Sequence, residues 1–123
     1  MPITYTIDEK SGVILESWQG TITADDLAAY WRGLLADPAA MALRRTVADL
    51  RRSRLAFSGA ELMQLVDEIA TPRLAGSSWK TAIIVDTPDQ FGVSRQYQVY
   101  AEHYSRDAIF HDPDAALRWV LTD

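Results

Sequence analysis

Three aspartates stand where apolar segments end, a position at which carboxylates can do chemistry. Asp49, Asp86 and Asp112 each close a short run that is typical of a strand. Because the carboxyl ends of parallel strands meet at one edge of a sheet, these side chains would offer oxygen ligands for Mg²⁺ there. Metal-binding receiver domains also need a lysine after the last strand, whereas the interior lysine here, Lys80, begins a strand, and a helix-cap role explains Asp112. We therefore expect no metal site.

The two histidines permit an enzyme hypothesis. A triad of Ser58, His111 and Asp86 can be drawn, and Asp49, Asp86 and His111 would form a polar cleft at the carboxyl edge of the sheet. The sequence around Ser58 lacks the G-x-S-x-G pattern of a nucleophile turn. It also contains no spaced set of metal ligands, no P-loop and no dinucleotide glycine pattern. We therefore expect no catalytic residue and no cofactor.

Ser58 has two explanations. It begins an S-x-x-E pattern with Glu61, which is the capping box of a helix N-terminus. A phosphate on the same hydroxyl would meet unpaired backbone N–H groups and the positive end of the helix dipole. Ser58 is therefore a predicted helix cap at a position that would also stabilise a phosphate, and the family resemblance described below makes it a candidate phosphoacceptor or switch.

Arg51, Arg52 and Arg54 form the densest basic cluster of an acidic chain, in a stretch that we predict to be a loop after the third strand. Guanidinium groups bind phosphates, acidic head groups and acidic protein surfaces. Short charge runs are also common on solvated loops. The cluster is thus a candidate anion or partner contact.

Aromatic side chains recur at helical spacing and supply a third candidate site. Such stripes usually form core, but they also line cavities for apolar or lipid-like molecules, and buried tyrosine hydroxyls need partners. A pocket between helix and sheet and a subunit interface both remain open. The candidate pocket residues are Tyr30, Trp31, Phe91, Tyr97, Tyr100 and Tyr104.

Composition narrows the class of protein. The chain has 123 residues, 48% of them hydrophobic, a net charge of −5 and no cysteine. The acidic balance argues against nucleic acid as a partner, because phosphate binding needs a surplus of lysine and arginine. The sequence has no apolar run long enough to span a membrane and no signal peptide, so a cytoplasmic location is expected.

The period of the apolar residues predicts the elements that position these side chains. Alternation or short apolar runs predict strands, and a spacing of three to four predicts helices. Helices are expected after caps at Thr23, Ser58, Thr87 and Asp112, and Pro38 is expected to end the first. Residues 51–57 and 71–78 are predicted loops. The predicted strands are residues 3–8, 13–18, 46–50, 79–86 and 108–111.

The resulting order, ββαβαβαβα, predicts an α/β fold in one domain spanning residues 1–123. The five residues 8–12, from the last residue of the first strand to the start of the second, allow only a hairpin, so these strands should be antiparallel. The later units require parallel strands joined by right-handed crossovers. The segment 79–86 lacks alternation and should be a strand that is covered on both faces.

This arrangement, with Asp49-Leu50, Ser58-Gly59 and the closing Asp112–Trp119 segment, resembles the SpoIIAA-like or STAS family, which includes anti-sigma-factor antagonists and the SEC14-type domain. In regulatory members a serine before glycine at this helix start is phosphorylated, which the resemblance transfers to Ser58. Ala56-Phe57 stands where those proteins usually carry Asp-Ser. The sequence is therefore closer to the uncharacterised SpoIIAA-like branch.

Two functions are carried forward from the sequence. The first is a non-catalytic regulatory or protein-interaction module, whose partner is another protein or a second copy of the chain. Its recognition surface would be the helix start at Ser58 and the arginine cluster. The second is binding of a small apolar or lipid-like ligand beneath the aromatic third helix.

Overall fold

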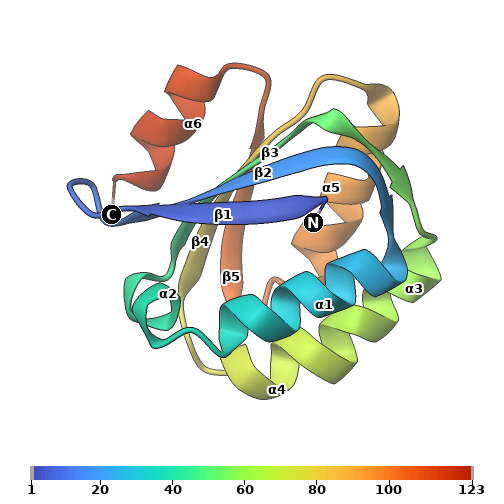
Figure 1. Ribbon diagram of the computed structural model, residues 1–123, viewed down its shortest axis with the longest axis horizontal. Helices are drawn as coiled ribbons and strands as arrows, with labels where there is room; N and C mark the ends of the chain where they lie inside the picture. The colour runs from blue at the N-terminus through green and yellow to red at the C-terminus, as the bar shows by residue number, and fades with distance from the viewer. Residues whose placement is uncertain (1, 123) are drawn as a thin grey trace.

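The computed structural model describes residues 2–122 and contains a five-stranded sheet in the order β1-β2-β3-β4-β5 (Figure 1). The first pair of strands is antiparallel, and the remaining pairs are parallel. The hairpin between β1 and β2 closes through Gly12, whose φ of 74° is favourable for glycine. The strands are β1 Ile3–Asp8, β2 Val13–Thr23, β3 Arg45–Ala56, β4 Trp79–Ile84 and β5 Ser105–Phe110.

Helical segments connect the parallel strands and follow the last one. Capping boxes at Thr23, Ser58 and Thr87 begin three of them, and Asp112 caps the last with its side chain. Each cap satisfies backbone N–H groups that the helix itself leaves unpaired. The segments are α1 Ala24–Leu35, α2 Pro38–Leu43, α3 Gly59–Leu65, η1 Val66–Ala70 (a π-helix), α4 Thr71–Leu74, α5 Pro88–Tyr100 and α6 Pro113–Val120.

The strand order decides where the helices lie. From β2 to β5 each parallel strand is added on the same side of the previous one. Right-handed crossovers that advance in one direction place their helices on one face of the sheet. Figure 1 shows α1, α3, α4 and α5 on that face and α6 alone on the other.

Two hydrophobic clusters fill the space on either side of the sheet. The larger lies beneath α1, α3, η1, α4 and α5, and the smaller packs α6 against β3 and β4 through Val47, Ile84, Ala116 and Val120. Beside α6 the sheet is more open, and the side chain of Leu15 on β2 is 39% exposed. An open groove of about 300 Å³ lies on this face, lined by residues that include Leu15, Val47 and Ile84, whereas the space inside the larger cluster is more enclosed.

The predicted fold class is confirmed: an α/β domain with a mostly parallel sheet of five strands and an antiparallel N-terminal strand. The strand predicted at 79–86 is an internal one, and every residue of β4 is buried. The caps at Thr23, Ser58, Thr87 and Asp112 were predicted correctly.

The second and third strands are longer than predicted, and the predicted loop at 51–57 is wrong. β2 continues to Thr23 and β3 to Ala56, and the two pair in parallel beyond a bulge at which β3 carries one extra residue. Gly20, with φ of 75°, accommodates the path of β2 there. The bulge shifts the alternation of exposed and buried side chains, which hides the continuing strand from a pattern of period two.

Two connections also differ from the prediction. Pro38 does not simply end the first helix but occupies the first position of α2, which Asp37 caps. The predicted loop at 71–78 begins with α4, because the helix that starts at Gly59 continues through η1 to Leu74. Pro72 has no N–H for the carbonyl of Glu68, which removes one α-helical hydrogen bond beside the π-helix.

Candidate functional site

A cavity of about 90 Å³ lies inside the larger hydrophobic cluster, between the sheet and α1, η1, α4 and α5. Small side chains leave this space, since Ala48 on β3 and Ala70 on η1 are both buried in its wall. Protein interiors are close-packed, and voids larger than a water molecule are few in any domain. The lining residues include Leu27, Leu34, Leu50, Leu55, Leu62, Leu74, Ile83 and Val93.

Glu16 on β2 places a carboxyl group in this apolar wall. The side chain is 9% exposed, and its Oε1 accepts a hydrogen bond of 3.0 Å from Nε1 of Trp18. Burial raises the pKa of Glu16, and its interactions with the Tyr30 hydroxyl and the Trp18 indole oppose this shift. Within residues 2–122 no lysine, arginine or histidine forms an ion pair with Glu16.

Tyr30 on α1 lies next to this carboxyl group. Its side chain is 5% exposed, and its ring packs edge-on against Tyr5 with centroids 6.0 Å apart. Burial, followed by the negative charge of Glu16, raises the pKa of Tyr30. The buried hydroxyl group interacts with the Glu16 carboxyl but completes no hydrogen bond of ordinary geometry within the described part of the chain. It is therefore a polar atom with unused bonding capacity.

A second polar cluster lies toward β5. The hydroxyl groups of Tyr97 and Tyr104 share a hydrogen bond of 3.1 Å. Nearby, Oδ1 of Asp107 accepts from Oγ of Ser105 at 2.7 Å, whereas the buried Oδ2 completes no hydrogen bond of ordinary geometry among residues 2–122, although the carboxyl group also interacts with the Thr81 side chain. Burial raises the pKa of Asp107 to about 6. Tyr97 and the neighbouring Thr81 connect this cluster to the cavity wall.

The six aromatic candidates are only partly brought together. Trp31 and Tyr97 line the cavity and pack against each other with ring centroids 5.9 Å apart. Tyr104 lies beyond the end of α5 and reaches the site through Tyr97. Tyr100 is half-buried against the larger cluster, and Phe91 is 44% exposed.

Ser58 is exposed at the N-terminus of α3. Its Oγ accepts a hydrogen bond from the N–H of Glu61 at 3.1 Å, and the Glu61 carboxylate accepts from the N–H of Ser58 at 2.9 Å. This reciprocal pair accounts for both residues of the predicted box. The hydroxyl nevertheless remains accessible from solvent.

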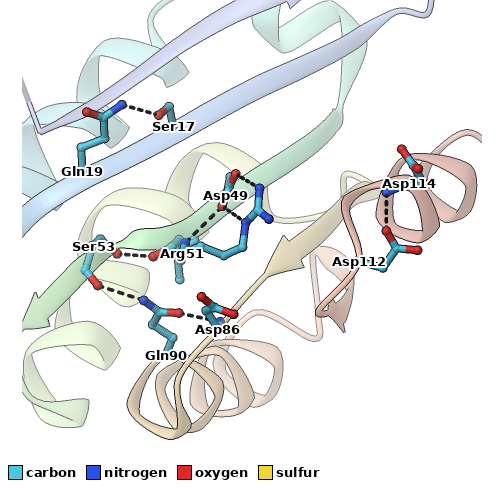
Figure 2. Close-up of polar contacts among 10 residues, drawn as sticks. Ser17, Gln19, Asp49, Arg51, Ser53, Asp86, Gln90, Asp112 and Asp114 are labelled. Atoms are coloured by element: carbon cyan, nitrogen blue, oxygen red, sulfur yellow. Dashed lines mark hydrogen bonds and ion pairs between the residues drawn. The ribbon is translucent and has the colours of Figure 1, made fainter.

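The arginine cluster lies on β3 rather than in a loop. Arg51 is held by Asp49, with Nη2 to Oδ2 at 2.9 Å and Nε to Oδ1 at 3.0 Å (Figure 2). This hydrogen-bonded ion pair lowers the pKa of Asp49. Arg52 and Arg54 are exposed, and Arg54 contacts the hydroxyl of Thr21 at 3.4 Å.

The three strand-end aspartates have separate local roles. Asp49 binds Arg51, Asp112 caps α6, and Asp86 adjoins Gln90, whose side-chain oxygen accepts from the N–H of Asp86 at 2.7 Å (Figure 2). Gln90 also donates to the carbonyl of Ser53 at 2.9 Å, which joins α5 to the bulged part of β3. Residues 2–122 contain no group of three acidic, histidine or cysteine side chains that could hold a metal ion.

A comparison with solved structures finds the same architecture in an uncharacterized protein of the DUF3478 family from Shewanella loihica PV-4, described as having a SpoIIAA-like fold. The match covers 96% of this chain and 93% of the other, with a TM-score of 0.64 and 17% sequence identity. This chain has the SpoIIAA-like fold. The resemblance inferred from the sequence is confirmed at the level of fold.

The other comparisons add no family assignment, because no family model and no curated protein matches the chain. No helix within residues 2–122 is long and apolar enough to span a membrane. Any function assigned to the cavity must therefore be argued from the geometry of the cavity itself.

Proposed function

We propose that the chain is a non-catalytic binding module that holds a small, largely apolar molecule in the cavity beneath α1 and α5. The supporting observation is the cavity itself, about 90 Å³ in volume and lined mostly by leucine, isoleucine, valine and tryptophan. An engineered apolar cavity of about 150 Å³ binds benzene, so the buried part of this ligand is smaller than benzene. The half-buried Trp31 and Tyr97 form the wall nearest solvent.

Filling the cavity should abolish binding while the fold is retained. Ala70→Leu adds three carbon atoms at a buried position of the wall, and we expect it to weaken binding of 1-butanol by at least about tenfold. Chemical-shift titration of the lining residues measures this effect. Ala60→Leu, on the exposed side of α3, is the matched control and should bind as the wild type does.

Native mass spectrometry of the protein purified from its own host provides the direct test. A co-purified mass in the wild type that is missing in Ala70→Leu supports the proposal. A spectrum of ligand-free wild type, together with unchanged lining-residue shifts up to the solubility of 1-butanol, contradicts it.

A second candidate function is regulated recognition of another protein or a second copy of the chain, and surface chemistry favours it. Exposed Arg52 and Arg54 precede the exposed Ser58 in a chain whose net charge is −5. These guanidinium groups suit an acidic partner surface, and a phosphate on Ser58 would change the local charge. In this proposal, partner binding is regulated at the protein surface around Ser58 and not at the cavity.

The Ser58→Asp variant tests this second candidate. Aspartate is as good an N-cap as serine, so we expect unchanged stability but altered amounts of captured partner. Ser58→Asn keeps the cap without charge and is the control, whereas Ser58→Ala should lower the free energy of unfolding by about 1 kcal/mol. Equal recovery of the same proteins by the wild type and the Asp variant, measured by quantitative pull-down, removes support for the candidate.

A further inference from the structure

The charged carboxylate of Glu16 in an apolar cavity wall lowers the stability of the folded protein. Its neighbours across the sheet are Tyr5 on β1 and Ala48 on β3, and neither carries a charge that neutralises it. A buried carboxylate without a cation is costly, and one that packs against leucine and tryptophan contributes less than an apolar side chain would. The position therefore costs stability unless something in the cavity binds the carboxyl group.

Three other polar side chains of the wall, those of Thr46, Ser94 and Tyr97, are engaged in hydrogen bonds. Oγ1 of Thr46 accepts from Nε1 of Trp79 at 2.9 Å, and Oγ of Ser94 donates to the carbonyl of Gln90 at 2.8 Å. Tyr97 is paired with Tyr104. Glu16 retains hydrogen-bonding capacity, since a carboxylate offers about four acceptor sites and its described partners are the Trp18 indole and the Tyr30 hydroxyl.

The charged form of Glu16 favours a ligand that donates hydrogen bonds and carries a positive charge. An ionised carboxylate only accepts hydrogen bonds, and a cationic donor forms the stronger, charge-assisted kind. The buried Tyr30 hydroxyl interacts with the Glu16 carboxyl through its proton, and its oxygen can accept a hydrogen bond from the same donor. A group that carries several N–H bonds and a positive charge meets both requirements.

We propose that the cavity binds a small primary amine, whose ammonium group pairs with the Glu16 carboxylate while its hydrocarbon part fills the apolar space. This inference rests on the proposed ligand-binding function and names the chemical class of the ligand. The volume of about 90 Å³ limits the hydrocarbon part to a short chain. Leu27 on α1 and Leu62 on α3 are among the side chains that such a chain contacts.

Three probes of equal chain length test the proposal: butylamine, 1-butanol and butyrate, titrated at pH 7 and followed by the chemical shifts of the lining residues. Wild type should bind butylamine at least about tenfold more tightly than 1-butanol, and it should bind butyrate most weakly because like charges repel. Glu16→Gln should lose that preference for the amine while its affinity for 1-butanol stays within about twofold. Glu102→Gln, the same substitution on an exposed side chain, should bind as the wild type does.

The outcomes separate the two proposals. If 1-butanol and butylamine bind wild type equally, or Glu16→Gln keeps the preference for the amine, the cavity binds ligands but the amine inference is wrong. If none of the probes shifts the lining residues, the proposed function fails and the amine inference fails with it. The comparison of probes on wild type requires no variant, so an unfolded Glu16→Gln leaves the proposal testable.

Discussion

Asp107→Asn should stabilise the protein at pH 8 by about 3 kcal/mol in the free energy of unfolding. The pKa of this carboxyl is raised by burial from 3.8 to about 6, so the charged form is disfavoured in the folded state. Asparagine keeps an oxygen that can accept from Ser105 and replaces the buried Oδ2 by a neutral NH₂ group. The variant therefore removes a buried charge without removing volume.

The direction of the pH dependence follows from the raised pKa of Asp107. Between about pH 4 and pH 6 the folded protein binds this proton and the unfolded chain releases it, so wild-type stability falls as pH rises through this range. The advantage of Asp107→Asn should be greatest above pH 6 and should shrink toward zero near pH 4. Urea denaturation at pH 4 and pH 8 measures it, with the exposed Asp67→Asn as control. A gain of equal size at both pH values contradicts this explanation.

Lys80→Met should destabilise the protein by about 3 kcal/mol. Lys80 is 4% exposed, and its Nζ donates to the carbonyl oxygens of Trp119 at 2.7 Å and Thr122 at 2.6 Å. The same ammonium lies 4.3 Å from the centroid of the Trp119 ring. A cation at a helix C-terminus also interacts favourably with the helix dipole, and methionine removes all of these contributions while keeping a similar length.

Guanidinium denaturation provides the measurement for Lys80→Met. Lys10→Met, in the exposed hairpin turn, is the matched substitution and should change the free energy of unfolding by less than about 0.5 kcal/mol. Arg45 on β3 also donates to the carbonyl of Val120 at 2.6 Å, so α6 should remain partly anchored. Equal stabilities of the two lysine variants would show that the ammonium does not hold α6.

Much of the fold was predictable because local signals agree with one another. Ser58 with Glu61 and Thr87 with Gln90 mark helix starts by side-chain chemistry alone, and the unbroken apolar run in β4 marks a strand covered on both faces. The predictions that were wrong, the loops at 51–57 and 71–78, depended on irregular backbone geometry that a short stretch of sequence does not reveal. The bulge in β3 and the π-helix η1 both change the period of the chain, and a fixed period cannot follow such a change.

The candidate site was less predictable, because its acidic groups carry no motif. Glu16 is in phase with Ile14 and Trp18 along β2, which is the one signal that would have placed a carboxyl on the buried face. Asp107 was missed because β5 begins at Ser105, earlier than the apolar run that predicted the strand. Aromatic spacing drew attention to α5, where Tyr97 lines the cavity, but spacing alone cannot say which rings turn inward.

Because the strands follow one another in sequence order across the sheet, the sheet separates the two hydrophobic clusters. The cavity occupies one side, whereas α6 and its anchors Arg45 and Lys80 occupy the other. The proposed ligand would contact residues on the cavity side of the sheet, whereas the contacts that hold α6 lie on the opposite side. Substitutions that loosen α6 and substitutions that fill the cavity should therefore have additive effects on stability.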